Sequence, residues 1–100
     1  MPNFRSRRLL DLIHDAPCMA SFPHQCNGPS VPMHSNELTW GRGYAHKSPD
    51  WAIASGCPEA HSYIDGVKGG WDKETKHAEW LRAYVKTQAW LWETGRVKVG

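Results

Sequence analysis

The chain has 100 residues, 40% of them hydrophobic and 22% charged, and its formal net charge at pH 7 is +2. This length predicts one domain, residues 1–100, with a limited hydrophobic core. The apolar content and six tryptophans exclude an intrinsically disordered chain, and apolar runs of only a few residues exclude a transmembrane span. Acidic residues follow Arg8 too early for a secretory signal to form, so we expect a cytoplasmic protein with no membrane partner.

The charge is unevenly divided along the chain. Residues 1–8 carry three arginines and no acidic residue, whereas residues 9–65 carry six acidic residues against only two basic ones. Residues 66–100 carry seven basic residues and four acidic ones. An acidic middle between basic flanks would suit a cation site beside a polyanion-binding surface, and scattered solvated charge is the simpler explanation.

The first half of the chain predicts one helix and two short strands. Apolar spacing predicts a short helix over residues 6–15, which the following Ala-Pro pair ends. Residues 17–49 contain five prolines and no sustained period, so loops and short strands are expected there. One strand is predicted at Val31–His34 and the second near Trp51–Ala54.

The second half predicts two helices. A helix at Pro58–Asp65 begins with a proline and an acidic residue, and Asp72 caps a longer helix over residues 73–94. The alternating segment Arg96–Val99 predicts an edge strand. The inner face expected for the long helix is apolar except for one glutamine: Trp80, Leu81, Tyr84, Val85, Gln88, Leu91 and Trp92.

Cysteine and histidine are the residues most suggestive of chemistry. The three cysteines, Cys18, Cys26 and Cys57, accompany six histidines. An odd number of cysteines in a cytoplasmic chain argues against a disulfide scaffold and favours metal binding or buried thiols. A zinc ion would also stabilise a domain whose core is small.

A possible cation site lies on the predicted helix Pro58–Asp65. His61 and Asp65 are four residues apart, so both side chains leave the same face, and His34 ends the first predicted strand. A histidine at a strand end and two donors on a helix can surround one divalent cation. Such helix pairs also occur by chance as surface or capping residues.

Four segments of residues 16–66 resemble, in order, the HNH, or His-Me finger, nucleases, and more closely a small phage and prophage nuclease-domain family. The segments read CMASFPHQCNG, MHSN, GRGYAHKSPD and GCPEAHSYID. The resemblance implies an α+β fold with a ββα-metal core and a long C-terminal helix. It also implies a metal-dependent DNA endonuclease in the cytoplasm of a bacterial host.

The resemblance implies a role for each matching residue of the active site. His34 matches the general base that takes a proton from the attacking water. His61 and Asp65 match the ligands of a catalytic Mg²⁺ or Mn²⁺ ion, which would neutralise charge on the scissile phosphate. Asp50 matches a loop aspartate that either orients His34 or completes the metal shell. The asparagine of the HNH motif is missing, because Ala52 stands in its place.

Two basic residues of the central loop are candidate DNA contacts. Arg42 and Lys47 lie among glycines close to the expected site in sequence, where they would bind DNA phosphates. The alternative interpretation is that both residues are solvated charges of the loop. For His34 the alternative is a histidine that is simply hydrogen-bonded at a strand end.

The resemblance also implies a structural zinc site, with one departure. Ala60 replaces the second cysteine of the family's Cys-x2-Cys-His motif, whereas structural zinc takes four protein ligands. His24 is therefore the predicted fourth ligand beside Cys18, Cys26 and Cys57. The alternative is that zinc is lost and the cysteines are merely buried.

The sequence thus predicts an α+β, loop-rich nuclease domain of three parts. These are a basic N-terminal helix (residues 1–15), a zinc and ββα-metal core (16–66) and a C-terminal helix (71–95). The predicted partner is DNA, and the protein would act as a monomer or a homodimer. The alternative function is a non-catalytic, zinc-stabilised module that binds nucleic acid or a host protein.

Overall fold

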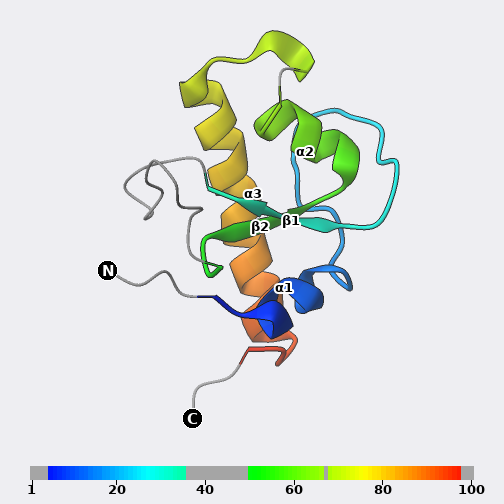
Figure 1. Ribbon diagram of the computed structural model, residues 1–100, viewed down its shortest axis with the longest axis vertical. Coiled ribbons are helices and arrows are strands. Elements are labelled where there is room, and N and C mark those ends of the chain that lie inside the picture. The colour runs from blue at the N-terminus through cyan, green and yellow to red at the C-terminus, as the bar shows by residue number, and fades with distance from the viewer. Residues whose placement is uncertain (1–4, 36–49, 67, 98–100) are drawn as a thin grey trace.

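The computed structural model describes residues 5–35, 50–66 and 68–97 and has the predicted α+β class. Its helices and strands, in chain order, are α1 (Arg7–Ile13), β1 (Val31–His34), β2 (Ile53–Gly56), α2 (Pro58–Ile64), the short 3-10 turn η2 (Lys68–Gly70) and α3 (Lys73–Glu93). Figure 1 shows the long α3 beside a small sheet, with α1 and α2 on either side of it.

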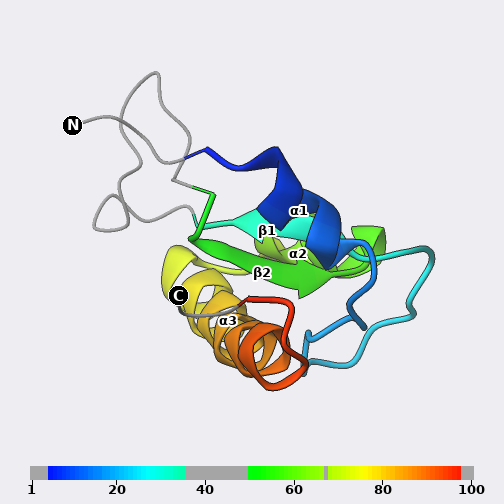
Figure 2. The same ribbon diagram turned by 90° about the horizontal axis from the view of Figure 1, so that it is seen from below.

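The two strands are antiparallel, and their register decides which side chains share a face. Met33 pairs with Ala54, and His34 pairs with Ile53. Successive side chains of a strand alternate, so these two pairs lie on opposite faces of the sheet. Figures 1 and 2 show α2 over one face and α1 over the other, while α3 passes along the β2 side.

The main hydrophobic core lies between the sheet, α2 and α3. Its buried residues are Phe22, Met33, Ala54, Cys57, Ala60, Ile64, Trp80 and Ala83. The indole N–H of Trp80 donates a 2.7 Å hydrogen bond to the carbonyl of Met33, which fixes α3 against β1. Because Met33 and Ala54 pack with Ala60 and Ile64, the core side of the sheet is the side that α2 covers.

The predicted inner face of α3 is only partly right. Trp80 and Leu91 are buried as predicted, but Leu81, Val85 and Trp92 are 38%, 61% and 48% exposed. The residues buried with Trp80 and Leu91 are Ala83 and Thr87. Small side chains allow α3 to lie close to β2, so the contact face is centred on them rather than on the bulky residues.

Thr87 is buried because it satisfies the backbone of β2. Its Oγ1 accepts a 2.9 Å hydrogen bond from the Ser55 N–H and donates a 2.7 Å bond to the Ala83 carbonyl. The Ser55 carbonyl accepts the Met19 N–H at 3.0 Å. In the part of the chain that the structure describes, the outer edge of β2 is thereby hydrogen-bonded without a third strand.

The remaining helix and strand boundaries lie within two residues of the prediction. Helix α1 ends at Ile13, two residues earlier than expected. The second strand begins two residues later than expected, at Ile53. The predicted edge strand is absent from its described residues, Arg96 and Val97. Gly95 adopts a φ of 74°, and the Gly95 and Arg96 N–H groups bond back to the carbonyls of Trp92 and Leu91. This Schellman-type ending turns the chain back on α3 instead of extending it.

None of the helices in the described residues is both long enough and apolar enough to cross a membrane. α3 has the length for a span, but charged residues recur along it.

We predict that Thr87→Val destabilises the protein by about 1–3 kcal/mol, because the buried Ser55 N–H loses its acceptor. Denaturant unfolding of the variant measures this loss. Thr87→Ser is the matched control, since it keeps the hydroxyl and removes only a methyl group. Equal stability of Thr87→Val and the native protein would contradict the role of this hydrogen bond.

Candidate metal centre and histidine site

Four predicted ligands come together at the junction of β2 and α2. One donor atom from each of Cys18, His24, Cys26 and Cys57 lies within 4.8 Å of the other three. The His24 Nε2 atom is 3.4 Å from the Cys18 Sγ and 3.3 Å from the Cys26 Sγ. Tetrahedral zinc with ordinary Zn–S and Zn–N bonds spaces its donors at roughly 3.5–4 Å. The cluster could therefore hold a zinc ion, and His24 stands where the sequence predicted the fourth ligand.

The ring of His24 is oriented for metal binding by its own loop. Its Nδ1 atom lies 2.8 Å from the carbonyl oxygen of Phe22, which can only accept a hydrogen bond. The proton is therefore on Nδ1, and the lone pair of Nε2 faces the sulfur atoms. This is the arrangement that fixes a histidine ligand in protein metal sites.

Cys57 connects the cluster to regular structure. It is the N-cap of α2, and its sulfur accepts the Ala60 N–H at 3.4 Å, while its own N–H donates to Cys18 Sγ at 3.3 Å. Burial raises the pKa of Cys57, but bonds from the Ala60 and Asn27 N–H groups and the neighbouring thiols outweigh it. The resulting pKa is about 7, below the ordinary 9.0.

Cys26 is the exposed member of the cluster. Its hydrogen bond to Cys57, followed by desolvation and the nearby Cys18, raises its pKa to about 11. At this pKa the Cys26 thiol keeps its proton near neutral pH. A cation at the centre of the cluster would replace thiol protons, because thiolates are the metal-binding form.

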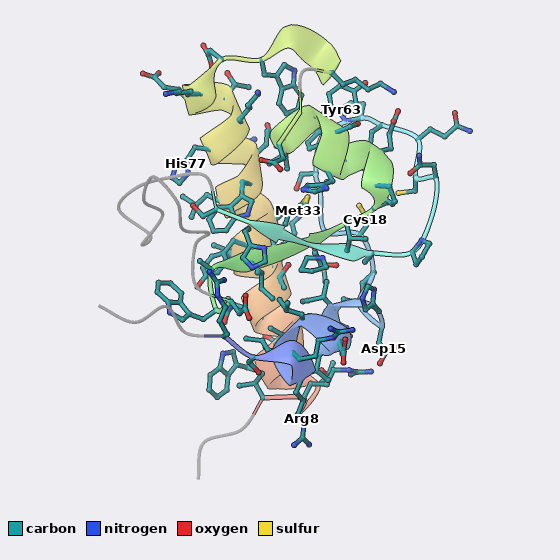
Figure 3. The ribbon with its side chains drawn as sticks, in the orientation of Figure 1. Arg8, Asp15, Cys18, Met33, Tyr63 and His77 are labelled. Atoms are coloured by element: carbon teal, nitrogen blue, oxygen red, sulfur yellow. The ribbon has the colours of Figure 1, made fainter. Side chains whose placement is uncertain are left out.

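Aromatic rings hold the ligand loop against the rest of the protein. Phe22 packs edge-on against Trp71 with ring centroids 4.8 Å apart, and Tyr63 of α2 lies 5.3 Å from the same indole. Figure 3 shows Cys18 near the start of α2 and Tyr63 on that helix. The loop therefore contacts α2 both through the cluster and through these rings.

A second group of polar residues lies at the opposite end of the strand pair. His34 Nε2 is 2.9 Å from Asp50 Oδ1, and the side chain of Asp50 is only 5% exposed. Arg5 Nη1 donates to the same oxygen at 3.1 Å, and the Ser6 N–H donates to Oδ2 at 2.7 Å. Both carboxylate oxygens are therefore engaged, and Asp50 connects His34 to the segment before α1.

The protonation of this pair follows from the environment of Asp50. Burial raises the pKa of Asp50, but hydrogen bonds from His34, the Ser6 N–H and Arg5 outweigh it and hold the pKa below the ordinary 3.8. The carboxylate is ionised near neutral pH and accepts only. His34 Nε2 therefore carries a proton and donates it to Asp50 Oδ1.

His61 and Asp65 lie together on α2, as their spacing predicts. His61 Nε2 is 3.4 Å from Asp65 Oδ2, and both side chains are partly exposed. In the described ranges, however, the Cys/His cluster is the one set of three or more such donors close enough to hold a metal. Among the described residues, this pair and the His34–Asp50 pair do not form one metal centre.

The sheet accounts for this separation. His34 shares the face of Ile53, whereas α2 packs on the face of Met33 and Ala54. In Figure 3, Met33 lies between the sheet and α2, and Arg8 of α1 lies on the opposite side. In the described residues, the two pairs therefore lie on different faces of the sheet.

The predicted DNA contacts, Arg42 and Lys47, lie outside the described residues. Arg5 and Ser6 were not predicted, although both hold Asp50. They are 45 and 44 residues away from it in sequence, and no local motif marks such a distant contact.

Comparison with known proteins gives one structural likeness. No protein-family model matches the chain, and no curated protein matches it. A solved structure described as a "putative bacteriophage protein" from Escherichia coli K-12 is similar to this chain, with a TM-score of 0.62 and 21% sequence identity. The alignment covers 86% of this chain and 98% of that one. At this identity the likeness shows a shared fold.

We predict one zinc ion per chain, and that chelating it lowers the melting temperature by more than about 10 °C, because its ligands anchor a loop to α2. Metal analysis and thermal unfolding test this. His24→Ala should weaken zinc retention, whereas His77→Ala, which changes a histidine stacked on Trp80 outside the cluster, should retain the ion. Zinc-free native protein of unchanged stability would contradict the site.

We also predict that Asp50→Asn destabilises the protein near neutral pH by about 1–3 kcal/mol, because charge-assisted bonds to a buried carboxylate are lost. A depressed pKa stabilises the fold above the unfolded value, near 3.8, and this contribution disappears as the pH falls through the folded value. The stability difference between the two proteins should therefore shrink as the pH falls below 4. A difference that grows below pH 4 would refute this assignment.

Proposed function

We propose that this protein is a metal-dependent DNA endonuclease of phage or prophage origin, which hydrolyses phosphodiester bonds with His34 as the general base. The observation that carries the proposal is the His34–Asp50 pair: a partly exposed imidazole held at 2.9 Å by a buried, ionised carboxylate. This pairing is a common means of orienting a catalytic histidine.

The atoms of His34 define its part in the reaction. Nε2–H donates to Asp50, so Nδ1 takes the proton of a water molecule as that water attacks phosphorus. A new P–O bond forms, the bond to the leaving sugar oxygen breaks, and solvent protonates that oxygen. Asp50 remains ionised throughout and stabilises the imidazolium that results.

The proposed Mg²⁺ or Mn²⁺ ion would be held by His61 and Asp65. An imidazole nitrogen and a carboxylate oxygen suit Mn²⁺, and Mg²⁺ commonly uses one or two carboxylates while water and substrate phosphate fill its other positions. When bound, such an ion supplies positive charge that stabilises the negative charge developing on the phosphate.

Three features support this function without depending on one another. The order of β1, β2 and α2 is that expected of a ββα-metal unit. The Cys/His cluster occurs at the strand–helix junction, within the segments that carry the family resemblance. The similar solved structure is described as a phage protein.

A second candidate is a non-catalytic, zinc-stabilised module that binds nucleic acid. The observation in its favour is that His34 and the His61–Asp65 pair lie on different faces of the sheet. Such a module needs the Cys/His cluster but no water-activating base, so the two functions differ in their dependence on His34.

We predict that zinc-loaded native protein nicks or cuts plasmid DNA when Mg²⁺ or Mn²⁺ is added. His34→Ala should lower the cleavage rate by about 10²–10⁴-fold, because the general base is lost, while DNA binding changes little. Divalent ions must be varied by dialysis and addition, since a strong chelator would also remove zinc. Gel assays of cleavage and of mobility measure the two properties separately.

His77→Ala is the matched control, because it removes a histidine that lies outside both polar groups. Cleavage by His34→Ala at the native rate would remove this residue from the mechanism. DNA binding without cleavage by the native protein, under every divalent ion tested, would favour the non-catalytic module.

A further inference from the structure

The segment before α1 contacts the histidine site although it is more than 40 residues away from Asp50 in sequence. Arg5 Nη1 lies 3.1 Å from Asp50 Oδ1, the same oxygen that contacts His34 Nε2. The Ser6 N–H lies 2.7 Å from Asp50 Oδ2. One carboxylate therefore joins the N-terminal segment to the strand that carries the histidine.

We propose that Arg5, together with the backbone N–H of Ser6, is a positioning element of the histidine site: the two donors fix the Asp50 carboxylate so that its Oδ1 holds His34 in one ring orientation and one tautomer. Arg5 acts through Asp50 and is not itself a catalytic residue.

The place of Asp50 in the fold explains why it needs such donors. The hydrogen bond from the Ser35 N–H to the Ala52 carbonyl extends the strand pairing to Ala52, and Asp50 lies two residues farther on. Its side chain is nevertheless buried and ionised. A buried carboxylate outside the sheet ladder takes its orientation from the groups that bond it, and a donor on each oxygen opposes rotation of the carboxylate plane.

The geometry of Ser6 supports the same role. Ser6 is the N-cap of α1, and its hydroxyl accepts the Leu9 N–H at 3.1 Å. The hydroxyl thus fixes the start of the helix while the backbone N–H of the same residue bonds Asp50. Movement of the start of α1 would move both donors and, through Asp50, the imidazole.

Arg5 also differs from the other arginines of this segment. Its side chain is half-exposed and paired with a nearly inaccessible partner, whereas Arg7 is largely exposed and pairs with exposed Asp11 one helical turn away, at 3.3 Å. Exposed pairs of the second kind contribute little. Arg7 is therefore a matched control for Arg5: the same residue type, two positions away, on the other side of Ser6.

The test compares Arg5→Ala, Arg5→Lys and Arg7→Ala in the full zinc-loaded chain. The first readout is ¹⁵N NMR of the His34 ring, which reports the tautomer and the exchange rate of Nε2–H whether or not the protein cleaves DNA. The second readout rests on the proposed function and is the separation of kcat from KM in DNA cleavage. Thermal unfolding checks that each variant is folded.

We expect Arg5→Ala to speed exchange of the His34 Nε2–H by about tenfold or more and to lower kcat by about tenfold, with little change in KM, since small misplacements of a base are costly. Arg5→Lys should restore most of both properties, because it keeps a cationic donor. Arg7→Ala should match the native protein in both.

Each other outcome decides one of the two proposals. An unchanged His34 ring in folded Arg5→Ala overturns the positioning role, and a rise in KM alone would instead make Arg5 a substrate contact. A perturbed ring in a protein that never cleaves DNA supports the positioning role and refutes the proposed function. Should Arg5→Ala fail to fold, a native-like ring in Arg5→Lys supports the inference, and a ring released in Arg5→Lys despite a stable fold overturns it.

Discussion

The sulfur atom of Cys57 joins two parts of the chain that the small core alone would hold weakly. One part is regular structure, because Cys57 follows β2 and caps α2. The other is the irregular loop that carries Cys18, His24 and Cys26, whose donors gather around that sulfur. If the Cys/His cluster were lost, backbone hydrogen bonds would not hold this loop in place, because much of the loop is exposed to solvent. The placement of the loop, and of the aromatic rings beside it, therefore depends on this cluster.

The strand β2 connects Cys57 at one end of the sheet with the partner of His34 at the other end. All four of its residues are buried. One edge pairs with β1, and on the other edge Ser55 bonds both Thr87 and Met19. A strand held on both edges moves as one piece with its neighbours. The positions of Cys57 at one end and of His34, opposite Ile53, at the other are consequently linked through a rigid element.

Local patterns in the sequence predicted the elements whose cause is itself local. Asp72 caps α3, and the proline that opens α2 and the glycine that ends α3 mark those helix boundaries. The helical spacing of His61 and Asp65 likewise predicted their contact. His24 was predicted as a ligand from chemical need, because three cysteines lacked a fourth donor.

Features that depend on contacts between distant residues could not be predicted from the sequence. The buried face of α3 is chosen by the backbone of β2, which needs the hydroxyl of Thr87, and no periodicity of bulky residues reveals that need. Arg5 meets Asp50 across 45 residues. The separation of His34 from the helix pair follows from strand register, since a shift of one residue would exchange the faces.

The two candidate centres have different chemical consequences because they occupy opposite ends of one strand pair. Four paired residues span roughly 10 Å, too far for a zinc ion at Cys57 to touch a phosphate beside His34. Zinc in the Cys/His cluster would then act on folding, and only through the rigid β2 on the orientation of His34. A divalent ion that takes part in hydrolysis would act on rate without being needed for the fold. Loss of activity on chelation is therefore ambiguous by itself: it identifies a catalytic cation only when the fold, followed in the same sample, survives and added Mg²⁺ or Mn²⁺ restores cleavage.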